Sequence, residues 1–368
     1  MNDTPLRLAE LLRRHGLHLK KSLGQNFLAD PVHLDRIVAA AELSRADVVI
    51  EVGPGVGTLT ARLASQAGRV VAVELDASLL PALRDTLAGH DNVAIVQGDI
   101  LQLDPGQLPM VDGQLPMVDG QLPMVDGQLP MDNGQLSMVD GQLSMVDEQL
   151  PMVDGQLPMV DGQLPMVDGQ LSMVDGQLPM VDDALTAEAL TIDHCPLSID
   201  HYKVVANLPY YITSAAIRHL LTAAPRPDLI VLTIQREVAQ RIVARPPEMS
   251  LLAVSVQYFA RPEIVARIPA GAFYPPPKVD SAILRLRPWQ QPPVDAPDEE
   301  AFFAVARAGF GQRRKQLRNS LRANLNLSQE LTDALLHQAG IDPQRRAETL
   351  ELAEWARLAH AWRAVTGG

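Results

Sequence analysis

The stretch Glu51-Val-Gly-Pro-Gly-Val-Gly57 decides the fold, because it joins a run of β-branched residues to an amphipathic segment. The run Val48–Val52 predicts a buried strand, and Leu59 and Leu63 repeat at the spacing of one helix face. Glycine at the turn between them permits positive φ angles and lets the backbone come close to a ligand. We therefore expect a strand, a tight glycine-rich turn and a helix in succession.

Further β-branched runs follow along the chain, separated by segments with helical periodicity. The five runs in order are Val48–Val52, Val70–Glu74, Val93–Val96, Tyr202–Ala206 and Leu229–Gln235. Strands that alternate with helices predict a parallel sheet with crossover helices on its faces. Two later runs, Glu263–Ile268 and Asp280–Leu286, are joined by a Pro-rich turn too short for a helix and should pair antiparallel. The predicted fold class is α/β, with a Rossmann-like parallel sheet that ends in an antiparallel hairpin.

Acidic residues stand where the second and third strands end. Glu74 closes the second strand, 21 residues after Gly53, where a carboxylate can accept both hydroxyls of a ribose. Asp99 follows the third strand and is placed to accept the amine of an adenine. The third glycine, Gly57, comes one residue too early for a dinucleotide fingerprint, so the spacing favours S-adenosylmethionine (SAM). A glycine-rich turn or an acid at a strand end, taken alone, is common in proteins where it binds no ligand. Three such features at successive strand ends together support the prediction of a SAM site.

The motif Asn207-Leu-Pro-Tyr210 follows the fourth strand, at the sheet edge where open α/β folds bind ligands. Asn and Pro also favour plain turns. An aromatic amine becomes nucleophilic when acceptors hold its hydrogens and turn its lone pair toward a methyl donor. The Asn207 side-chain oxygen and the Leu208 carbonyl can be those acceptors, Pro209 stiffens the turn, and Tyr210 offers a face for stacking. Positioning and desolvation then determine the rate, and no strong base is needed.

The chain becomes helical after the Pro-rich linker Pro288–Pro297. Four helices are predicted, at Glu299–Phe310, Gln312–Asn324, Ser328–Ala339 and Leu350–Val365. The second carries five basic residues without an intervening acid, namely Arg313, Arg314, Lys315, Arg318 and Arg322. Such a cluster suits RNA phosphates, while a splayed base stacks on an aromatic ring. The alternative is that these cations pair with acids of the neighbouring domain.

A tandem array of eleven seven-residue units of the type GQLPMVD occupies Gly106–Asp182, between the third and fourth strands. Gly in ten units and Pro in eight exclude a coiled coil, despite the heptad spacing of the apolar residues. Turns stacked at the Asp-Gly steps are conceivable, but a disordered low-complexity segment is the simpler expectation. We therefore predict a catalytic domain at 1–105 and 183–288, a repeat insertion at 106–182, and a helical RNA-binding domain at 289–368.

Composition narrows the class of protein. The formal net charge of −13 over 368 residues becomes −1 without the 12 acids of the repeat, so it does not argue against a nucleic-acid partner. One cysteine, Cys195, excludes internal disulfides, and the nine histidines show no metal spacing, so no metal is expected. No apolar run reaches the roughly 18 residues of a membrane span, and charges interrupt the amino-terminal segment. We expect a cytoplasmic protein that acts as a monomer.

Six segments together resemble the small-subunit ribosomal RNA adenine N6,N6-dimethyltransferases, the KsgA family. They are Lys20–Leu28 (KKSLGQNFL), Glu51–Thr60, Asn207–Tyr210, Gln235–Arg241, Phe273–Ser281 and Phe310–Leu321, in the order of that family. The resemblance covers almost the whole chain outside the repeat, which enters shortly after Asp99 where the family has a short connection.

The resemblance implies methyl transfer from SAM to two adjacent adenosines in the terminal hairpin of small-subunit rRNA, within a pre-ribosomal subunit. It implies that Gln25, Asn26 and Leu28 help close the SAM site. Gly53, Gly55 and Gly57 would line that site, Glu74 would hold the ribose and Asp99 the adenine. Phe273 would pack on the target base opposite Tyr210.

Two rival functions remain open. Methyltransferases that modify large-subunit rRNA and confer macrolide resistance share the SAM and Asn-Leu-Pro-Tyr elements, although the segments Lys20–Leu28 and Phe273–Ser281 favour the small-subunit enzyme. An assembly factor that binds immature subunits without methylating them is the second. Every inferred contact residue is present, which favours an active enzyme.

Overall fold

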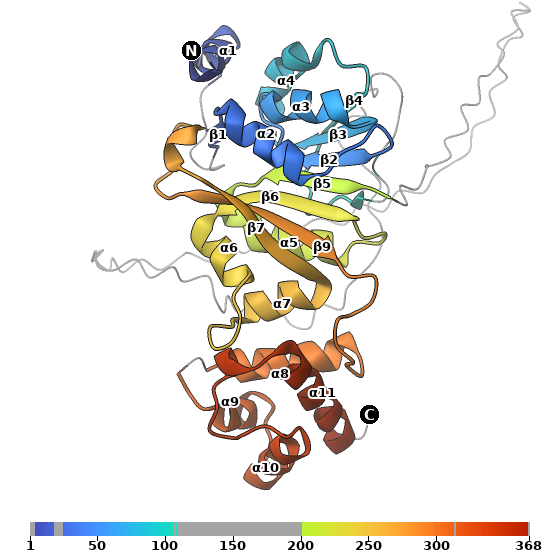
Figure 1. Cartoon of the computed structure of the whole chain (residues 1–368), viewed down its shortest axis with the longest axis vertical. Helices are drawn as coiled ribbons and strands as arrows, with labels where there is room; N and C mark the ends of the chain where they lie inside the picture. The colour runs from blue at the N-terminus through green and yellow to red at the C-terminus, as the bar shows by residue number, and fades with distance from the viewer. Residues whose placement is uncertain (1–3, 18–24, 106–107, 109–200, 313, 367–368) are drawn as a thin grey trace, which may run out of the picture. The chain divides into compact units, whose positions relative to one another are not determined.

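The computed structural model describes residues 4–17, 25–105, 108, 201–312 and 314–366 (Figure 1). The predicted repeat insertion lies outside the described residues except for Leu108, which is buried in the core. Arg313 of the predicted RNA-binding set also lies outside them. The division into domains at residues 105, 182 and 288 stays a prediction.

The central element is a mixed seven-stranded sheet (Figure 1). Its strands, in spatial order, are β4 (Val93–Gln97), β3 (Arg69–Glu74), β2 (Val48–Val52), β5 (Lys203–Asn207), β6 (Leu229–Gln235), β9 (Ser281–Pro288) and β7 (Ala260–Ile268). The first five are parallel to one another, and β9 runs antiparallel to both β6 and β7. The predicted parallel sheet and antiparallel pair are confirmed. β9, the later of the two final strands, lies inside the sheet and β7 forms the edge.

Helices cover both faces of this sheet. They are α2 (Pro31–Ala40), α3 (Thr58–Gln66), α4 (Leu80–Leu87), α5 (Thr213–Thr222), α6 (Arg236–Ile242) and α7 (Leu251–Phe259), preceded by α1 (Thr4–Arg14). Alternate residues of a strand point to opposite faces. Val49 accordingly packs in one buried cluster with Leu34 of α2, whereas its neighbour Ile50 packs in another with Ile217 of α5. Strands that are covered on both faces explain the continuous apolar runs.

A second, two-stranded sheet was not predicted. β1 (Phe27–Leu28) pairs antiparallel with β8 (Phe273–Tyr274), so that Leu28 lies opposite Phe273. The backbone N–H groups of Ala29 and Asp30 both donate to the carbonyl of Ala272, at 2.9 and 3.2 Å. These contacts hold the amino-terminal segment against the loop between β7 and β9, although about 245 residues separate the two in the chain.

The carboxy-terminal part consists of α8 (Glu299–Phe310), α9 (Leu317–Asn324), α10 (Gln329–Gln338) and α11 (Leu352–Thr366). The side chains of Asp298 and Ser328 cap α8 and α10, and Gly340 takes the positive φ expected of a helix terminator. The predicted helix Gln312–Asn324 is wrong in its first turn, because α9 begins only at Leu317. The Leu317 N–H donates to the carbonyl of Arg345 instead of continuing a helix.

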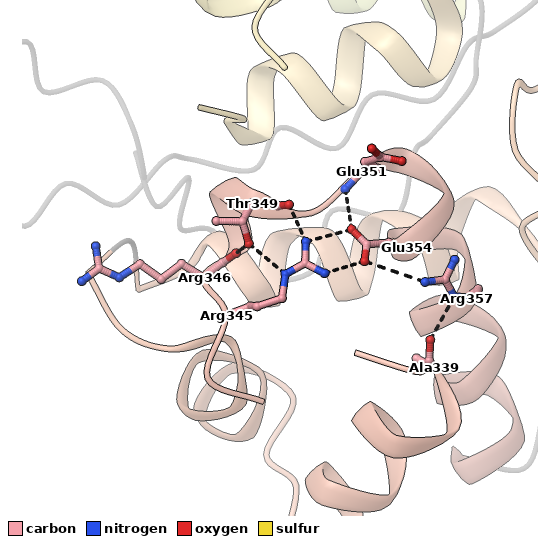
Figure 2. A network of polar contacts seen from close by, with 7 residues as sticks. All are labelled: Ala339, Arg345, Arg346, Thr349, Glu351, Glu354 and Arg357. Carbon is pink, nitrogen blue, oxygen red and sulfur yellow. Dashed lines mark hydrogen bonds and ion pairs between the residues drawn. The ribbon is translucent and has the colours of Figure 1, made fainter. Parts of the chain in front are cut away.

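A polar network holds the segment that leads into α11 (Figure 2). The Arg345 guanidinium donates to both carboxylate oxygens of Glu354, at 2.5 and 3.0 Å, and to the Thr349 carbonyl at 2.5 Å. Glu354 also accepts the backbone N–H of Glu351 at 2.9 Å. The Glu354 pKa lies below its usual range: the surrounding hydrogen bonds and charges outweigh burial, which alone raises it. This bidentate ion pair fixes the loop before α11. The start of α9 is attached to the same loop, through the Leu317 N–H and the Arg345 carbonyl.

Candidate active site

A cleft opens at the carboxyl ends of β2, β3 and β5, the sheet edge at which ligands of open α/β folds bind. The space enclosed by its lining residues, including the solvent at its mouth, is about 850 Å³. Most of the predicted cofactor and catalytic residues line it. These are Gln25, Asn26, Gly53, Gly55, Glu74, Asp99, Asn207, Leu208, Pro209, Tyr210 and Phe273.

The glycine-rich turn has the backbone geometry that its sequence predicts. Gly53, Gly55 and Gly57 all have positive φ angles, of 70°, 60° and 87°. A Cβ atom on Gly55 would lie 2.5 Å from the Phe27 ring, so glycine is required there for space as well as for conformation. The turn therefore depends on β1, which presses an aromatic ring against it.

Two predicted cofactor residues do not line this cleft. Gly57 is the N-cap of α3, and a Cβ atom there would meet Leu83 and Thr86 of α4, at 3.0 and 3.2 Å. The Leu28 side chain is buried in the core cluster that covers α2 and α3. Their role in the structure is packing: Gly57 lets two helices approach, and Leu28 anchors β1.

Glu74 is buried at the end of β3 and holds the floor of the cleft together. Its two carboxylate oxygens accept the backbone N–H groups of Gly55, at 2.9 Å, and Asp76, at 2.8 Å. Burial raises the pKa of Glu74, while these two N–H donors oppose that rise. A carboxylate has about four lone-pair positions. The N–H groups of Gly55 and Asp76 occupy two of them and the Leu75 N–H also donates to Glu74, which leaves capacity to accept a hydroxyl. The acid thus fixes the glycine-rich turn and remains able to bind a ribose.

Asp76 and Gln25 form a polar contact that the sequence alone did not indicate. The Gln25 amide donates to the Asp76 carboxylate at 2.9 Å, which ties the amino-terminal segment to the loop after β3. Asp99 also lines the cleft, is half-buried, and accepts the backbone N–H of Leu101 at 3.0 Å. The apolar side chains of Leu75 and Ile100 line the same cavity. A slot lined by apolar side chains and by the carboxylates of Glu74 and Asp99 suits an adenosine.

The other half of the cleft carries Asn207 and two aromatic side chains. The Asn207 amide nitrogen donates to the Asn26 carbonyl at 3.1 Å, so its side-chain oxygen stays available as an acceptor. The Tyr210 hydroxyl is hydrogen-bonded to Ser281 Oγ at 2.9 Å, and Phe273 is buried in the cavity wall. Tyr211 also lines the cavity and is 60% exposed. No role for Ser281 or Tyr211 could be predicted from their residue types.

Glu51, the first residue of the glycine-rich stretch, is fully buried beneath the site. Its Oε2 atom has no hydrogen-bond partner among the described residues. Burial raises the pKa of Glu51 to about 8, and the nearby Glu74 carboxylate adds to the rise. Glu51 is therefore predominantly neutral at pH 7.

The predicted RNA-binding residues fall into two groups. Arg314 and Lys315 are exposed in the turn before α9, not on a helix as predicted, and make no ion pair with a described residue. Arg318 and Arg322 lie one turn apart on α9. Arg318 pairs with Asp333 of α10 at 2.6 Å, whereas Arg322 is exposed. The predicted alternative of pairing with acids thus applies to Arg318, although its partner is on a neighbouring helix.

Within the part of the chain that the structure describes, no group of three or more His, Cys, Asp or Glu side chains could hold a metal ion. None of the described helices is long and apolar enough to cross a membrane. The residues of the cleft fit SAM: at Gly55 there is no room for a side chain, and Glu74 and Asp99 line a slot whose other walls include apolar side chains. The fold and this cleft define a SAM-dependent methyltransferase.

Comparisons identify the family. The fold is similar to that of the 23S rRNA methyltransferase ErmE (TM-score 0.56, 23% identity, 91% of this chain and 99% of that chain). It is also similar to a dimethyladenosine transferase from Plasmodium falciparum (TM-score 0.58, 19% identity, 92% and 98%). Residues 16–140 and 178–363 match the sequence model of the ribosomal RNA adenine dimethylases, and the chain belongs to that family.

Curated relatives agree over almost the whole length. The Ribosomal RNA small subunit methyltransferase A of Pelotomaculum thermopropionicum is 37% identical over 362 residues, 98% of this chain and 96% of the relative. Its namesake from Moorella thermoacetica is 37% identical over 357 residues, 96% of each chain. The protein is thus an enzyme that transfers methyl groups from SAM to adenines of ribosomal RNA.

Proposed function

We propose that this enzyme dimethylates the N6 amines of two adjacent adenosines in the 3′-terminal hairpin of small-subunit rRNA, within a pre-ribosomal small subunit. The observation that supports this most strongly is one cleft that joins a cofactor slot at Glu74 to a base slot at Asn207, Tyr210 and Phe273. The names of the relatives quoted above, which specify the small subunit, support the choice of substrate.

Asn207 and Leu208 are proposed to activate the amine. When bound, SAM supplies an electrophilic methyl group on a sulfonium centre. Asn207 is fixed because its amide nitrogen donates to the Asn26 carbonyl, so its oxygen can accept one amine hydrogen. The Leu208 carbonyl is proposed to accept the other. Two acceptors in the plane of the amine hydrogens turn the nitrogen lone pair out of conjugation and toward the methyl group.

The aromatic walls are proposed to hold the target base. Tyr210 stacks on one face of the flipped adenine and Phe273 packs on the other, while Pro209 keeps the turn between Asn207 and Tyr210 rigid. Burial raises the pKa of Tyr210, which keeps its hydroxyl protonated at neutral pH. Tyr210 therefore acts through its ring and not as a base. The same walls exclude water from the reacting amine.

The remaining roles concern the partner. We propose that residues 289–368 form the RNA-binding domain, in which Arg313, Arg314, Lys315, Arg318 and Arg322 contact phosphates. The unpaired cations before α9 support this role most directly, because no carboxylate of a described residue neutralises them. We further propose that the enzyme works as a monomer in the cytoplasm, where ribosomal subunits assemble.

The test is transfer of labelled methyl groups from SAM to purified, unmethylated small subunits, large subunits and free rRNA, followed by mapping of the modified nucleotides. Label on two adjacent adenosines of the small-subunit hairpin is the expected result. Label on a large-subunit adenine would make the enzyme a large-subunit methyltransferase. Binding to subunits without label would make it an assembly factor.

A further inference from the structure

Among the residues that the structure describes, the Ser281 hydroxyl is the only hydrogen-bond partner of the Tyr210 hydroxyl. The proposed reaction gives the Ser281 hydroxyl no direct role. The two oxygens are 2.9 Å apart, and either can be the donor. Ser281 is 0% exposed, as the first residue of β9, where it lies opposite Gln235 of β6 and Ile268 of β7. The serine thus stands on a position fixed by two neighbouring strands.

The preceding residue, Asp280, connects this position to the other aromatic wall. Its Oδ1 atom accepts the backbone N–H of Ala270 at 3.1 Å, and its Oδ2 atom accepts from Arg267 Nε at 3.1 Å. Its backbone carbonyl accepts the N–H of Arg236 at 3.0 Å. Ala270 begins the short 3-10 turn that ends directly before Phe273. One dipeptide therefore contacts Tyr210 on one side and the turn before Phe273 on the other.

Tyr210 needs such a contact because its backbone does not fix its ring. Tyr210 begins a three-residue 3-10 turn, Tyr210–Ile212, in which no residue is buried. A tyrosine ring in a partly open wall can move about its side-chain bonds, whereas one hydrogen bond at the hydroxyl fixes the far end of the ring. A hydroxyl partner that is itself buried has few other positions to adopt.

We infer that Ser281 is a positioning residue, which holds the Tyr210 ring at the angle and depth at which the target adenine stacks on it. The inference rests on the proposed stacking role of Tyr210 and deepens it. Ser281 touches neither the substrate nor the cofactor in this account. It acts only through the tyrosine hydroxyl, and this restriction makes the inference testable.

The test is a double-mutant cycle of Ser281→Ala and Tyr210→Phe in the full-length enzyme, measured as the single-turnover methylation rate of unmethylated small subunits at saturating SAM. Each single variant should react roughly five- to ten-fold more slowly, the loss typical of one hydrogen bond. The double variant should be no slower than either single variant, because both remove the same interaction. SAM affinity should stay unchanged in all three.

Two controls separate the possible outcomes. Thr332→Ala removes another fully buried hydroxyl, which bonds the Ser328 carbonyl in α10, and should leave the rate unchanged. Tyr210→Ala should be slower than Tyr210→Phe.

If Tyr210→Ala reacts at the wild-type rate, the proposed stacking role fails and the inference with it. If Tyr210→Ala is slow but the losses of Ser281→Ala and Tyr210→Phe multiply, only the inference is overturned. Single variants at the wild-type rate would overturn it equally.

Discussion

The two halves of the cleft are built in different ways. The cofactor half comes mainly from consecutive strand ends, at Gly53, Glu74 and Asp99, within about 50 residues of chain. The amino-terminal segment adds the Phe27 ring against Gly55 and the Gln25 amide that donates to Asp76. The base half joins segments from distant parts of the chain: Asn26, Asn207 and Phe273 meet only because β1 pairs with β8 and β5 lies beside β2. The residues of the cofactor half can be predicted from motif spacing, because most of them come from successive βα units. The residues of the base half cannot, because they meet only through the pairing of strands that are distant in the chain.

The largest effect is expected from Asn207→Ala, which removes an acceptor in the base half alone. The single-turnover rate at saturating SAM should fall at least about 100-fold, the usual effect of losing one preorganised polar contact in a transition state. SAM affinity and subunit binding should stay close to wild type. Accumulation of dimethyladenosine at the wild-type rate would exclude Asn207 as an acceptor.

The next effect concerns Glu74 in the cofactor half. Glu74→Ala should weaken SAM binding by roughly 10- to 150-fold, as expected from the loss of charge-assisted hydrogen bonds worth about 1.5 to 3 kcal/mol. Calorimetry measures the affinity. Glu74→Gln is a partial control: its single amide oxygen can still accept the Gly55 N–H that orders the turn, but its amide nitrogen cannot accept the Asp76 N–H. An unchanged affinity in both variants would remove Glu74 from the cofactor site.

A third prediction addresses the cations before α9. Replacing Arg313, Arg314 and Lys315 by Glu should weaken binding to the subunit and flatten its dependence on salt. Each lost phosphate contact lowers the slope by roughly 0.7 to 0.9. SAM affinity should not change, since neither Arg314 nor Lys315 lines the cleft. A salt slope equal to that of the wild type would mean that RNA docks elsewhere.

The buried Glu51 gives a prediction about pH. Its pKa is about 8 in the folded state against an ordinary 4.5, so the unfolded chain loses this proton first. The contribution of this group to the free energy of unfolding is therefore full below about pH 4.5 and is lost as the pH rises toward 8. Glutamine does not titrate, so Glu51→Gln removes this pH-dependent loss of unfolding free energy. Urea unfolding at pH 5, 6.5 and 8 should show the variant gaining stability relative to wild type as the pH rises, and parallel curves would contradict this assignment.

The smallest effect is expected from shortening the repeat. Leu108, within the first unit, is buried in the core, so the deletion should start at Pro109 and end at Asp182. The closure cost of a flexible loop grows only logarithmically with its length, by about 1 to 2 kcal/mol for a several-fold change. SAM binding and methylation should therefore persist. A deletion variant that folds and binds SAM but cannot methylate subunits would give the repeat a role in substrate recognition.

Sequence patterns predicted the sheet more completely than the site. The bounds of β2 and β6 agree with their β-branched runs, and Glu74 and Asp99 line the predicted cofactor slot. The two-residue strands β1 and β8 were missed, because such short strands carry no periodicity. The place of β9 inside the sheet was missed as well, since strand order depends on tertiary packing. Ser281 could not be recognised from its residue type, because only the fold brings it to Tyr210.

The separation of the two halves can be tested in one experiment, a titration of SAM against the single-turnover methylation rate of Glu74→Ala and Asn207→Ala. High SAM concentrations should restore the rate of Glu74→Ala to near the wild-type value, because that substitution lowers the affinity for the cofactor and leaves the base half in place. They should not restore Asn207→Ala, whose cofactor half is intact. Rescue of Asn207→Ala by SAM, or a Glu74→Ala rate that stays low at saturation, would contradict the assignment of separate roles to the two halves.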